Sequence, residues 1–376
     1  MVLRSKLLLA VSVVGVVGLG FLWTRRGAEG RPFPNGTKVG VAGPVSVIAY
    51  SPEGAVLCAS PSGFLQTYLP DKGRFRSFTV TPEVGDGQFG GQFGSSTRRL
   101  RFSKDGKQVF VGLPQRSGYV VVFDVEKRRS LYSFQGPLTN VFDVSPDEKW
   151  AACGVNGGIV LVDLKKPKPR RKTTVERPAA FKEYATRFYG AAATPGSAAF
   201  SPDSRTLAVG FGGQIALFDT DGDFQIPHLQ CDMKGAAMPL ELSARPGPGG
   251  EAFGFDMNPY WLEWSPDGTR LAALTNSEIL IFNSNLQRIA ASPLPPNRSQ
   301  SNMMGDMSAN IVWAPDGRRL FSGGGIVSSW SVPDLQLQTS YDVSGPVALS
   351  PNGKTLLTNS QGLPGDTPHL LQWNVG

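Results

Sequence analysis

The chain has 376 residues, with 37 Lys and Arg against 30 Asp and Glu, 40% hydrophobic residues, 45 Gly, 30 Pro, 3 Cys and 2 His. The hydrophobic content excludes wholesale disorder, three cysteines exclude a disulfide framework, and two histidines leave little for zinc sites or histidine-based catalysis. The many Gly and Pro residues argue against a helical bundle and for short strands joined by tight turns.

The net charge of +7 is concentrated in two short segments. The first 26 residues hold four basic residues and no acid, and residues 165–172 (KKPKPRRK) hold six basic residues, again without an acid. The remainder of the chain is therefore slightly acidic. A nucleic-acid-binding surface needs positive charge spread over a face, so we expect no nucleic-acid partner.

The amino-terminal segment has the pattern of a membrane anchor. Residues 7–23 are apolar except for Ser12, and basic residues flank them on both sides. The length is at the short end of a membrane span, and no small-residue cleavage site follows. We expect an uncleaved anchor over residues 1–26, with a cleaved signal as the alternative, and a linker over 27–36. The flanking charges leave the orientation open, and an exported domain, periplasmic or extracellular, is our expectation.

A short phrase, an apolar strand end followed by a tight turn, recurs seven times after the linker. The Pro presets φ at the first central position of the turn, Asp or Asn tolerates the second, and Gly adopts the left-handed conformation that follows. The copies are VIAYSPEG (47–54), LRFSKDG (100–106), VFDVSPDE (141–148), AAFSPDS (198–204), LEWSPDG (262–268), IVWAPDG (311–317) and VALSPNG (347–353).

Each turn is followed by further predicted strands. A second strand comes first, as in Thr206–Gly210 and Arg270–Leu274, and a fourth, outer strand is clearest in 130–135 and 337–343. A third strand ends on an aromatic or apolar residue followed by a polar one. These third strands are 119–124, 159–163, 215–219, 279–283, 327–331 and 370–374.

Seven units of four short strands predict an all-β fold, a seven-bladed β-propeller over residues 37–376. The S-P-D-G turn and the Phe-Asp, Phe-Asn and Trp-Asn pairs resemble the WD-repeat family, in which propellers act as protein-interaction scaffolds. The Gly-His pair of that family is absent throughout, so its histidine hydrogen-bond network is not carried over. The phrase at 264–272 is equally similar to TolB-like periplasmic propellers. The last repeat ends after its third strand, so we expect residues 37–42 to close it as its outer strand.

Four insertions carry the candidate binding residues. They cover 81–97, 165–197, 232–260 and 295–310, and we expect each to connect an outer strand with the next inner strand, on the face opposite the turns. A solvated loop without function is the alternative for each. The candidate partner-binding residues are Lys165, Lys166, Lys168, Arg170, Arg171, Lys172, Met303 and Met304.

The motifs of metal binding and catalysis are weak. Asp219, Asp221 and Asp223 alternate as at the start of a calcium loop, but the later Glu is missing, and a plain turn is the preferred interpretation. No G-x-S-x-G occurs, and the two histidines, His228 and His369, belong to different repeats. We therefore expect no cofactor.

The three cysteines are assigned no chemistry. We expect Cys58 and Cys153 to be buried on second strands, whereas Cys231 lies near an insertion and its exposure is left open.

The resulting hypothesis is a membrane-anchored, non-enzymatic platform with protein partners docking on the insertions. A propeller enzyme with a metal or cofactor at the central channel, or a TolB-like component of an envelope complex, is the alternative.

Overall fold

The computed structural model describes residues 37–41, 45–59, 64–69, 74–79, 99–113, 119–135, 138–155, 158–164, 173–174, 195–211, 213–220, 228–234, 259–295, 309–360 and 369–376. It divides the chain into two units, Met1–Gly36 and Thr37–Gly376, and all of the described residues belong to the second. The expected anchor over residues 1–26 and the linker therefore lie outside the described residues. Within the described part, no helix is long and apolar enough to cross a membrane.

The described residues form seven antiparallel sheets of four strands, which confirms the expected all-β propeller. We number the blades by their innermost strand. The strands of blades 1 to 3 are β2 (Val47–Tyr50), β3 (Val56–Ala59), β4 (Phe64–Leu69) and β5 (Arg74–Thr79); β6 (Leu100–Phe102), β7 (Gln108–Leu113), β8 (Tyr119–Asp124) and β9 (Arg129–Gln135); and β10 (Leu138–Val144), β11 (Trp150–Val155), β12 (Gly158–Asp163) and β13 (Thr173–Thr174).

The same four-strand order continues through blades 4 to 7. Their strands are β14 (Ser197–Phe200), β15 (Thr206–Phe211), β16 (Gln214–Asp219) and β17 (Leu229–Asp232); β18 (Trp261–Trp264), β19 (Arg270–Leu274), β20 (Glu278–Asn283) and β21 (Arg288–Pro293); β22 (Ile311–Trp313), β23 (Arg319–Ser322), β24 (Ile326–Ser331) and β25 (Leu337–Ser344); and β26 (Val347–Leu349), β27 (Thr355–Ser360), β28 (His369–Asn374) and β1 (Thr37–Val41).

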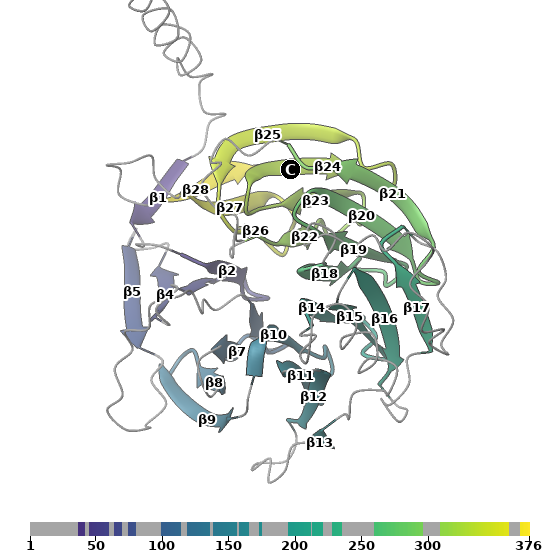
Figure 1. The fold of residues 1–376 in the computed structure, drawn as a ribbon. Helices are drawn as coiled ribbons and strands as arrows, with labels where there is room; N and C mark the ends of the chain where they lie inside the picture. Colours follow the sequence, from purple (N-terminus) through teal and green to yellow (C-terminus); the bar gives the residue numbers. More distant parts are fainter. Residues whose placement is uncertain are drawn as a thin grey trace, which may run out of the picture. The chain divides into compact units, whose positions relative to one another are not determined.

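The blades form a closed ring (Figure 1). The innermost strand of each blade lies near the centre of the ring, and β5, β9, β17, β21 and β25 lie at its periphery. Seven clusters of buried hydrophobic side chains fill the seven interfaces between neighbouring blades, including the interface between blades 7 and 1. Burial of each large apolar side chain contributes about 1.5–3 kcal/mol, so adhesion between blades stabilises the ring.

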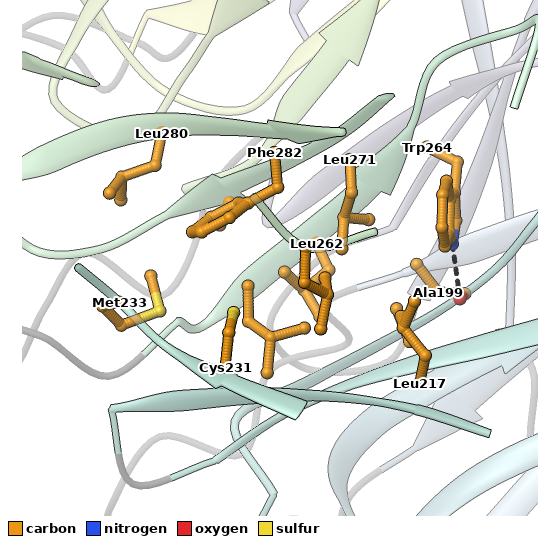
Figure 2. Close-up of a cluster of buried hydrophobic side chains, with 13 residues drawn as sticks. Ala199, Leu217, Cys231, Met233, Leu262, Trp264, Leu271, Leu280 and Phe282 are labelled. Atoms are coloured by element: carbon orange, nitrogen blue, oxygen red, sulfur yellow. Dashed lines mark hydrogen bonds between the residues drawn. The ribbon is translucent and has the colours of Figure 1, made fainter. Parts of the chain in front are cut away.

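The interface between blades 4 and 5 illustrates this packing (Figure 2). Leu217 and Cys231 of blade 4 meet Leu262 and Phe282 of blade 5, and all four side chains are almost fully buried. The indole Nε1 of Trp264 donates to the Ala199 carbonyl across the interface at 3.1 Å. Inner-strand tryptophans therefore couple neighbouring blades by a hydrogen bond as well as by buried area.

The seven turns between first and second strands share one geometry. The amide of the fourth residue donates to the carbonyl of the first, as from Gly268 to Ser265 at 2.9 Å. The five glycines at this fourth position have φ between 65° and 88°, and Glu148 and Ser204 adopt φ of 56° and 64° at the same place. Left-handed φ is the reason that five of the seven copies end in Gly.

A serine–carboxylate pair supports these turns, which the repeated phrase alone does not reveal. The hydroxyl of Ser265 donates to Asp267 Oδ1 at 2.5 Å and accepts the Arg270 amide at 3.0 Å, and Asp267 accepts the Thr269 amide. Blades 2, 3 and 4 repeat the pair with Asp, and blade 7 repeats it with Asn352. This network is local to each turn.

Strand β1 completes the last blade. β1 pairs with β28 in an antiparallel sense, with Thr37 opposite Gln372 and Val41 opposite His369. Blade 7 thereby receives its fourth strand, and β28 has a partner on both sides. Because β28 ends at the face that carries the turns, β1 begins at that face.

One topological expectation is wrong. The insertion 165–197 does not simply connect an outer strand with the next inner strand, because Thr173–Thr174 pair with Leu161 and Val160 as the fourth strand of blade 3. Residues 165–172 therefore connect β12 with β13, and both of these strand ends lie on the turn face. The sequence pattern does not predict β13, because a strand of two threonines next to a basic run has no apolar alternation.

Candidate functional site

Three charged side chains occupy one position of the repeat, two residues before the first residue of the turn. They are Arg101 on β6, Asp143 on β10 and Glu263 on β18, in blades 2, 3 and 5. The other four blades have Ala49, Ala199, Val312 and Ala348 at this position. Charged residues on innermost strands need partners, because burying an isolated charge is costly.

The three charges pair with one another across the ring. Arg101 Nε donates to Asp143 Oδ1 at 2.5 Å, and Arg101 Nη2 lies 3.1 Å from Glu263 Oε1. The Asp143 side chain is 1% exposed, whereas Glu263 and Arg101 are 20% and 32% exposed. The pairing of Arg101 with Glu263 joins residues 162 positions apart in the sequence, and blades 3 and 4 lie between them.

Arg99 adds a second cation two residues earlier. Its Nη1 donates to the Ala198 carbonyl at 2.5 Å, and its Nη2 donates to the Leu262 carbonyl at 2.8 Å and to Glu263 Oε2 at 2.5 Å. The guanidinium carbon lies 4.1 Å from the centroid of the Trp261 ring, which is a cation–π contact. Arg99 thus links blade 2 to the innermost strands of blades 4 and 5.

Asp143 is an acceptor from three directions. Its Oδ2 accepts the Phe200 amide at 2.8 Å and lies 3.6 Å from Arg99 Nη1, in addition to the Arg101 contact. Burial by itself raises the pKa of Asp143, but the charges of Arg101 and Arg99 outweigh it and hold the pKa below its usual range. Asp143 is therefore ionised at neutral pH and serves as a fixed acceptor.

The two arginines differ in their electrostatic environment. Burial of Arg99, followed by the neighbouring charge of Arg101, lowers the pKa of Arg99, although Glu263 and Asp143 act against this. Burial also lowers the pKa of Arg101, but Asp143 and Glu263 outweigh it and raise that pKa above its usual range. Two cations and two carboxylates leave the group formally neutral, so it links blades 2, 3, 4 and 5 without a net charge.

Two donors of this group are buried without an acceptor. They are Nε of Arg99 and Nε1 of Trp261. Arg99 is 6% exposed and Trp261 is 8% exposed. The corresponding indole groups of Trp264 and Trp313 both donate to inner-strand carbonyls, of Ala199 and Glu263. Trp261 is therefore the exception among these three inner-strand tryptophans.

The charged members of this group are not among the predicted site residues. The repeated phrases themselves contain Arg101, Asp143 and Glu263 where the other copies have Ala or Val. Opposite charges at one repeat position are therefore visible in the sequence, whereas their pairing depends on the closed ring.

Most of the predicted site residues lie outside the described residues. These are the six basic residues Lys165, Lys166, Lys168, Arg170, Arg171 and Lys172, together with Met303, Met304, Asp221 and Asp223. Asp219 ends β16 and is exposed. In the described part of the chain, no three His, Cys, Asp or Glu side chains gather in a way that could hold a metal ion.

The structure buries all three cysteines. Cys58 and Cys153 lie on β3 and β11 as expected, and burial raises the pKa of each thiol. Cys231, whose exposure the sequence leaves open, is also buried, because β17 packs its sulfur into the interface between blades 4 and 5 (Figure 2). Burial raises the pKa of Cys231 to about 12. None of the three thiols is therefore a ready nucleophile.

Comparison with known proteins shows the fold. A chain in the structure titled "Crystal Structure of Mitotic Checkpoint Complex" is 16% identical with a TM-score of 0.58, and the match covers 92% of this chain and 93% of that one. The β-propeller domain of Cps50 (Swd1), titled as from Myceliophteria thermophila, is 10% identical with a TM-score of 0.61, and the match covers 91% of this chain and 100% of that one. No family model matches the sequence. No curated protein matches it either.

Proposed function

We propose that this WD-repeat-like propeller is a non-enzymatic platform on which protein partners dock. The seven-bladed ring supports the proposal, since it fixes the strand ends from which four long connections leave the face opposite the turns. These connections join β5 to β6, β13 to β14, β17 to β18, and β21 to β22. Long connections on a rigid scaffold commonly carry binding function. The similarity to a chain of a multi-protein complex supports the same proposal.

The central charged group, formed by Arg99, Arg101, Asp143 and Glu263, supports a scaffold more than an acid–base catalyst. Both carboxylates of the group are held by arginines, and the lowered pKa of Asp143 keeps that carboxylate ionised. A general acid or base needs a pKa near the working pH. Asp143 lacks this property.

Membrane attachment through residues 1–26 belongs to the proposal. The apolar run 7–23 supports it, and an exported propeller is the orientation that we favour. The first described strand, β1, begins at the turn face of the propeller. Protease digestion of sealed, inverted membrane vesicles tests the orientation. For an exported domain, we expect the propeller to be protected from the protease in intact vesicles and to be digested after the vesicles are lysed.

The corrected topology bears on the basic run 165–172, whose residues are candidates for partner binding. Both strand ends that it joins lie on the turn face, at which β1 also begins. We propose that the run supports partner docking near the anionic membrane surface, where each basic residue contributes about 1 kcal/mol of attraction.

Replacing connections tests the platform. The segments 81–97, 176–193, 236–257 and 297–307 are each exchanged for a short Gly-Ser linker in the full-length protein, and partners are recovered from solubilised membranes and identified by mass spectrometry. We expect at least one exchange to abolish recovery of a specific partner while the thermal unfolding temperature stays within a few degrees. Unchanged recovery in all four variants would contradict the proposal.

A charge exchange in 165–172 tests the second face. Lys165 and Lys166 are changed to Gln, and the matched control changes exposed Lys104 and Lys107 of the blade 2 turn to Gln. We expect only the first variant to lose binding to vesicles that contain anionic lipid. Equal loss in both variants would show general electrostatics in place of a role for 165–172.

A further inference from the structure

The two unpaired donors at the centre of the ring lie in one stack. The Arg99 guanidinium carbon is 4.1 Å from the centroid of the Trp261 ring, and neither Arg99 Nε nor Trp261 Nε1 has an acceptor. Buried donors are normally paired, because an unmade hydrogen bond costs stability. Two such donors lie side by side at the centre of the ring, and this indicates that a ligand supplies their acceptor.

The charges around the donors indicate what kind of acceptor fits. Arg99 and Arg101 are balanced by Asp143 and Glu263, and every one of the four carboxylate oxygens is already in contact with an arginine. An entering anion would bring an unbalanced charge into this buried, neutral group. An uncharged acceptor adds two hydrogen bonds without that electrostatic cost.

The strand positions indicate the direction of approach. Trp261 is the first residue of β18, and Arg99 immediately precedes β6. Innermost strands begin at the face opposite the turns, which is the face that the long connections adjoin. The donors therefore lie beneath the surface at the end of the innermost strands that adjoins the docking face of the platform.

We propose that the centre of the ring binds an amide carbonyl presented by a protein partner, which accepts hydrogen bonds from Arg99 Nε and Trp261 Nε1. The inference rests on the proposed function and deepens it by naming the chemistry that the docking face recognises. Arg99 is held in place by the Ala198 and Leu262 carbonyls and by Glu263, so its remaining donor is preorganised.

Substitution of three tryptophans tests whether the Trp261 donor is unpaired in the free protein. Trp261→Phe removes an unpaired donor, whereas Trp264→Phe and Trp313→Phe remove donors to Ala199 and Glu263. All three changes remove the same atoms. Phe also keeps an aromatic ring for the cation–π contact with Arg99 at position 261, so the hydrogen bond is the main difference between the variants. We expect Trp261→Phe to lower the unfolding temperature least. A loss as large as in the other two variants would overturn the inference.

Titration with a small amide tests the acceptor. The probe is N-methylacetamide, acetate is the anionic comparison, and the readout is the indole resonances of the ¹⁵N-labelled full-length protein. We expect N-methylacetamide to shift the Trp261 resonance, identified by its absence in Trp261→Phe, more than those of Trp264 and Trp313. No selective shift, as for a site that holds water only, would overturn the proposal. A larger shift with acetate would overturn it in favour of an anion site.

Partner recovery separates this inference from the platform itself. If an exchanged connection abolishes recovery of a partner but Trp261→Phe recovers it at the wild-type level, the central acceptor site is excluded and the platform stands. We expect Trp261→Phe to reduce recovery at least tenfold.

Discussion

At the residue scale, the central charged group illustrates how a propeller uses distant positions of its sequence. Arg101 and Glu263 are visible in the repeated phrases as departures from Ala or Val. Their pairing was not visible, because the partners are separated by more than a hundred residues and meet only when the ring is closed. The sequence identifies the charged positions, and only the closed ring shows which of them pair.

Asp143→Asn should destabilise the protein at neutral pH by about 3 kcal/mol, because it leaves buried Arg99 and partly buried Arg101 with less negative charge than they need. The folded pKa of Asp143 is lowered below the unfolded value of about 3.9. Its stabilisation is therefore complete above pH 4 and is lost as the pH falls through the folded pKa. Urea unfolding at a series of pH values measures this dependence.

The difference between wild type and Asp143→Asn should accordingly shrink in strong acid. Exposed Glu53, in the turn of blade 1, supplies the control, and Glu53→Gln should change the unfolding free energy by less than about 0.5 kcal/mol. A constant difference across the whole acid range would show that the Asp143 charge is not the cause.

At the element scale, the turn between first and second strands is the unit that the sequence predicts best. Its boundaries follow from Pro, Asp and Gly alone, and the strands on either side are found where the pattern places them. What the pattern lacks is the serine–carboxylate pair, because a serine before a turn is also common for other reasons. The structure shows that Ser265 and Asp267 act together.

Blade 6 has Ala314 where five other turns have a serine paired to Asp or Asn. Ala314→Ser should stabilise the protein by about 1 kcal/mol, because a hydroxyl there has the Asp316 carboxylate and the Arg319 amide as partners. Ser265→Ala should destabilise it by a similar amount. Thermal unfolding measures both, and the absence of stabilisation by Ala314→Ser together with no loss in Ser265→Ala would show that the hydroxyl contributes nothing.

Ser265→Ala also has a consequence for a titration. The hydroxyl of Ser265 is the main reason that the pKa of Asp267 is lowered. We expect the pKa of Asp267 to rise in the variant, as followed by NMR of the labelled carboxyl carbon. Asp203, whose pKa is lowered mainly by Ser201 in its own turn, should not change.

Two turn glycines separate backbone strain from contact between blades. Gly317 has φ of 65° and nothing within 4 Å of an added Cβ, so Gly317→Ala should cost about 1 kcal/mol. Gly353 has φ of 70°, but its added Cβ would lie 2.9 Å from Pro315 Cδ of the neighbouring blade. Gly353→Ala should therefore cost more than Gly317→Ala in urea unfolding. Equal losses would show that the turns of blades 6 and 7 do not support each other.

At the scale of the whole molecule, stability depends on closing the ring. Seven interfaces are filled with apolar side chains, and the seventh joins the two ends of the repeat array. β1 completes blade 7 there. An unpaired β28 would expose a strand edge that invites association with other chains.

Prolines in β1 should open this closure. Lys38→Pro together with Gly40→Pro removes backbone donors opposite β28. The matched control, Ala290→Pro with Ser292→Pro, changes the outer strand of blade 5 at the same spacing. We expect the β1 variant to unfold several degrees lower than the control and to associate, as measured by thermal unfolding and light scattering. A variant that stays as stable and monomeric as the control would exclude a role of β1 in closure.

The sequence by itself determined the seven turns, the strands beside them and the number of blades. These are local properties, set by backbone φ preferences and by alternation over a few residues. Only the tertiary structure decided that Arg99, Arg101, Asp143 and Glu263 form one group, that Cys231 is buried, and that 165–172 connects β12 with β13. Each of these depends on which strands lie side by side, and a contact between distant segments leaves no local pattern for the sequence to display.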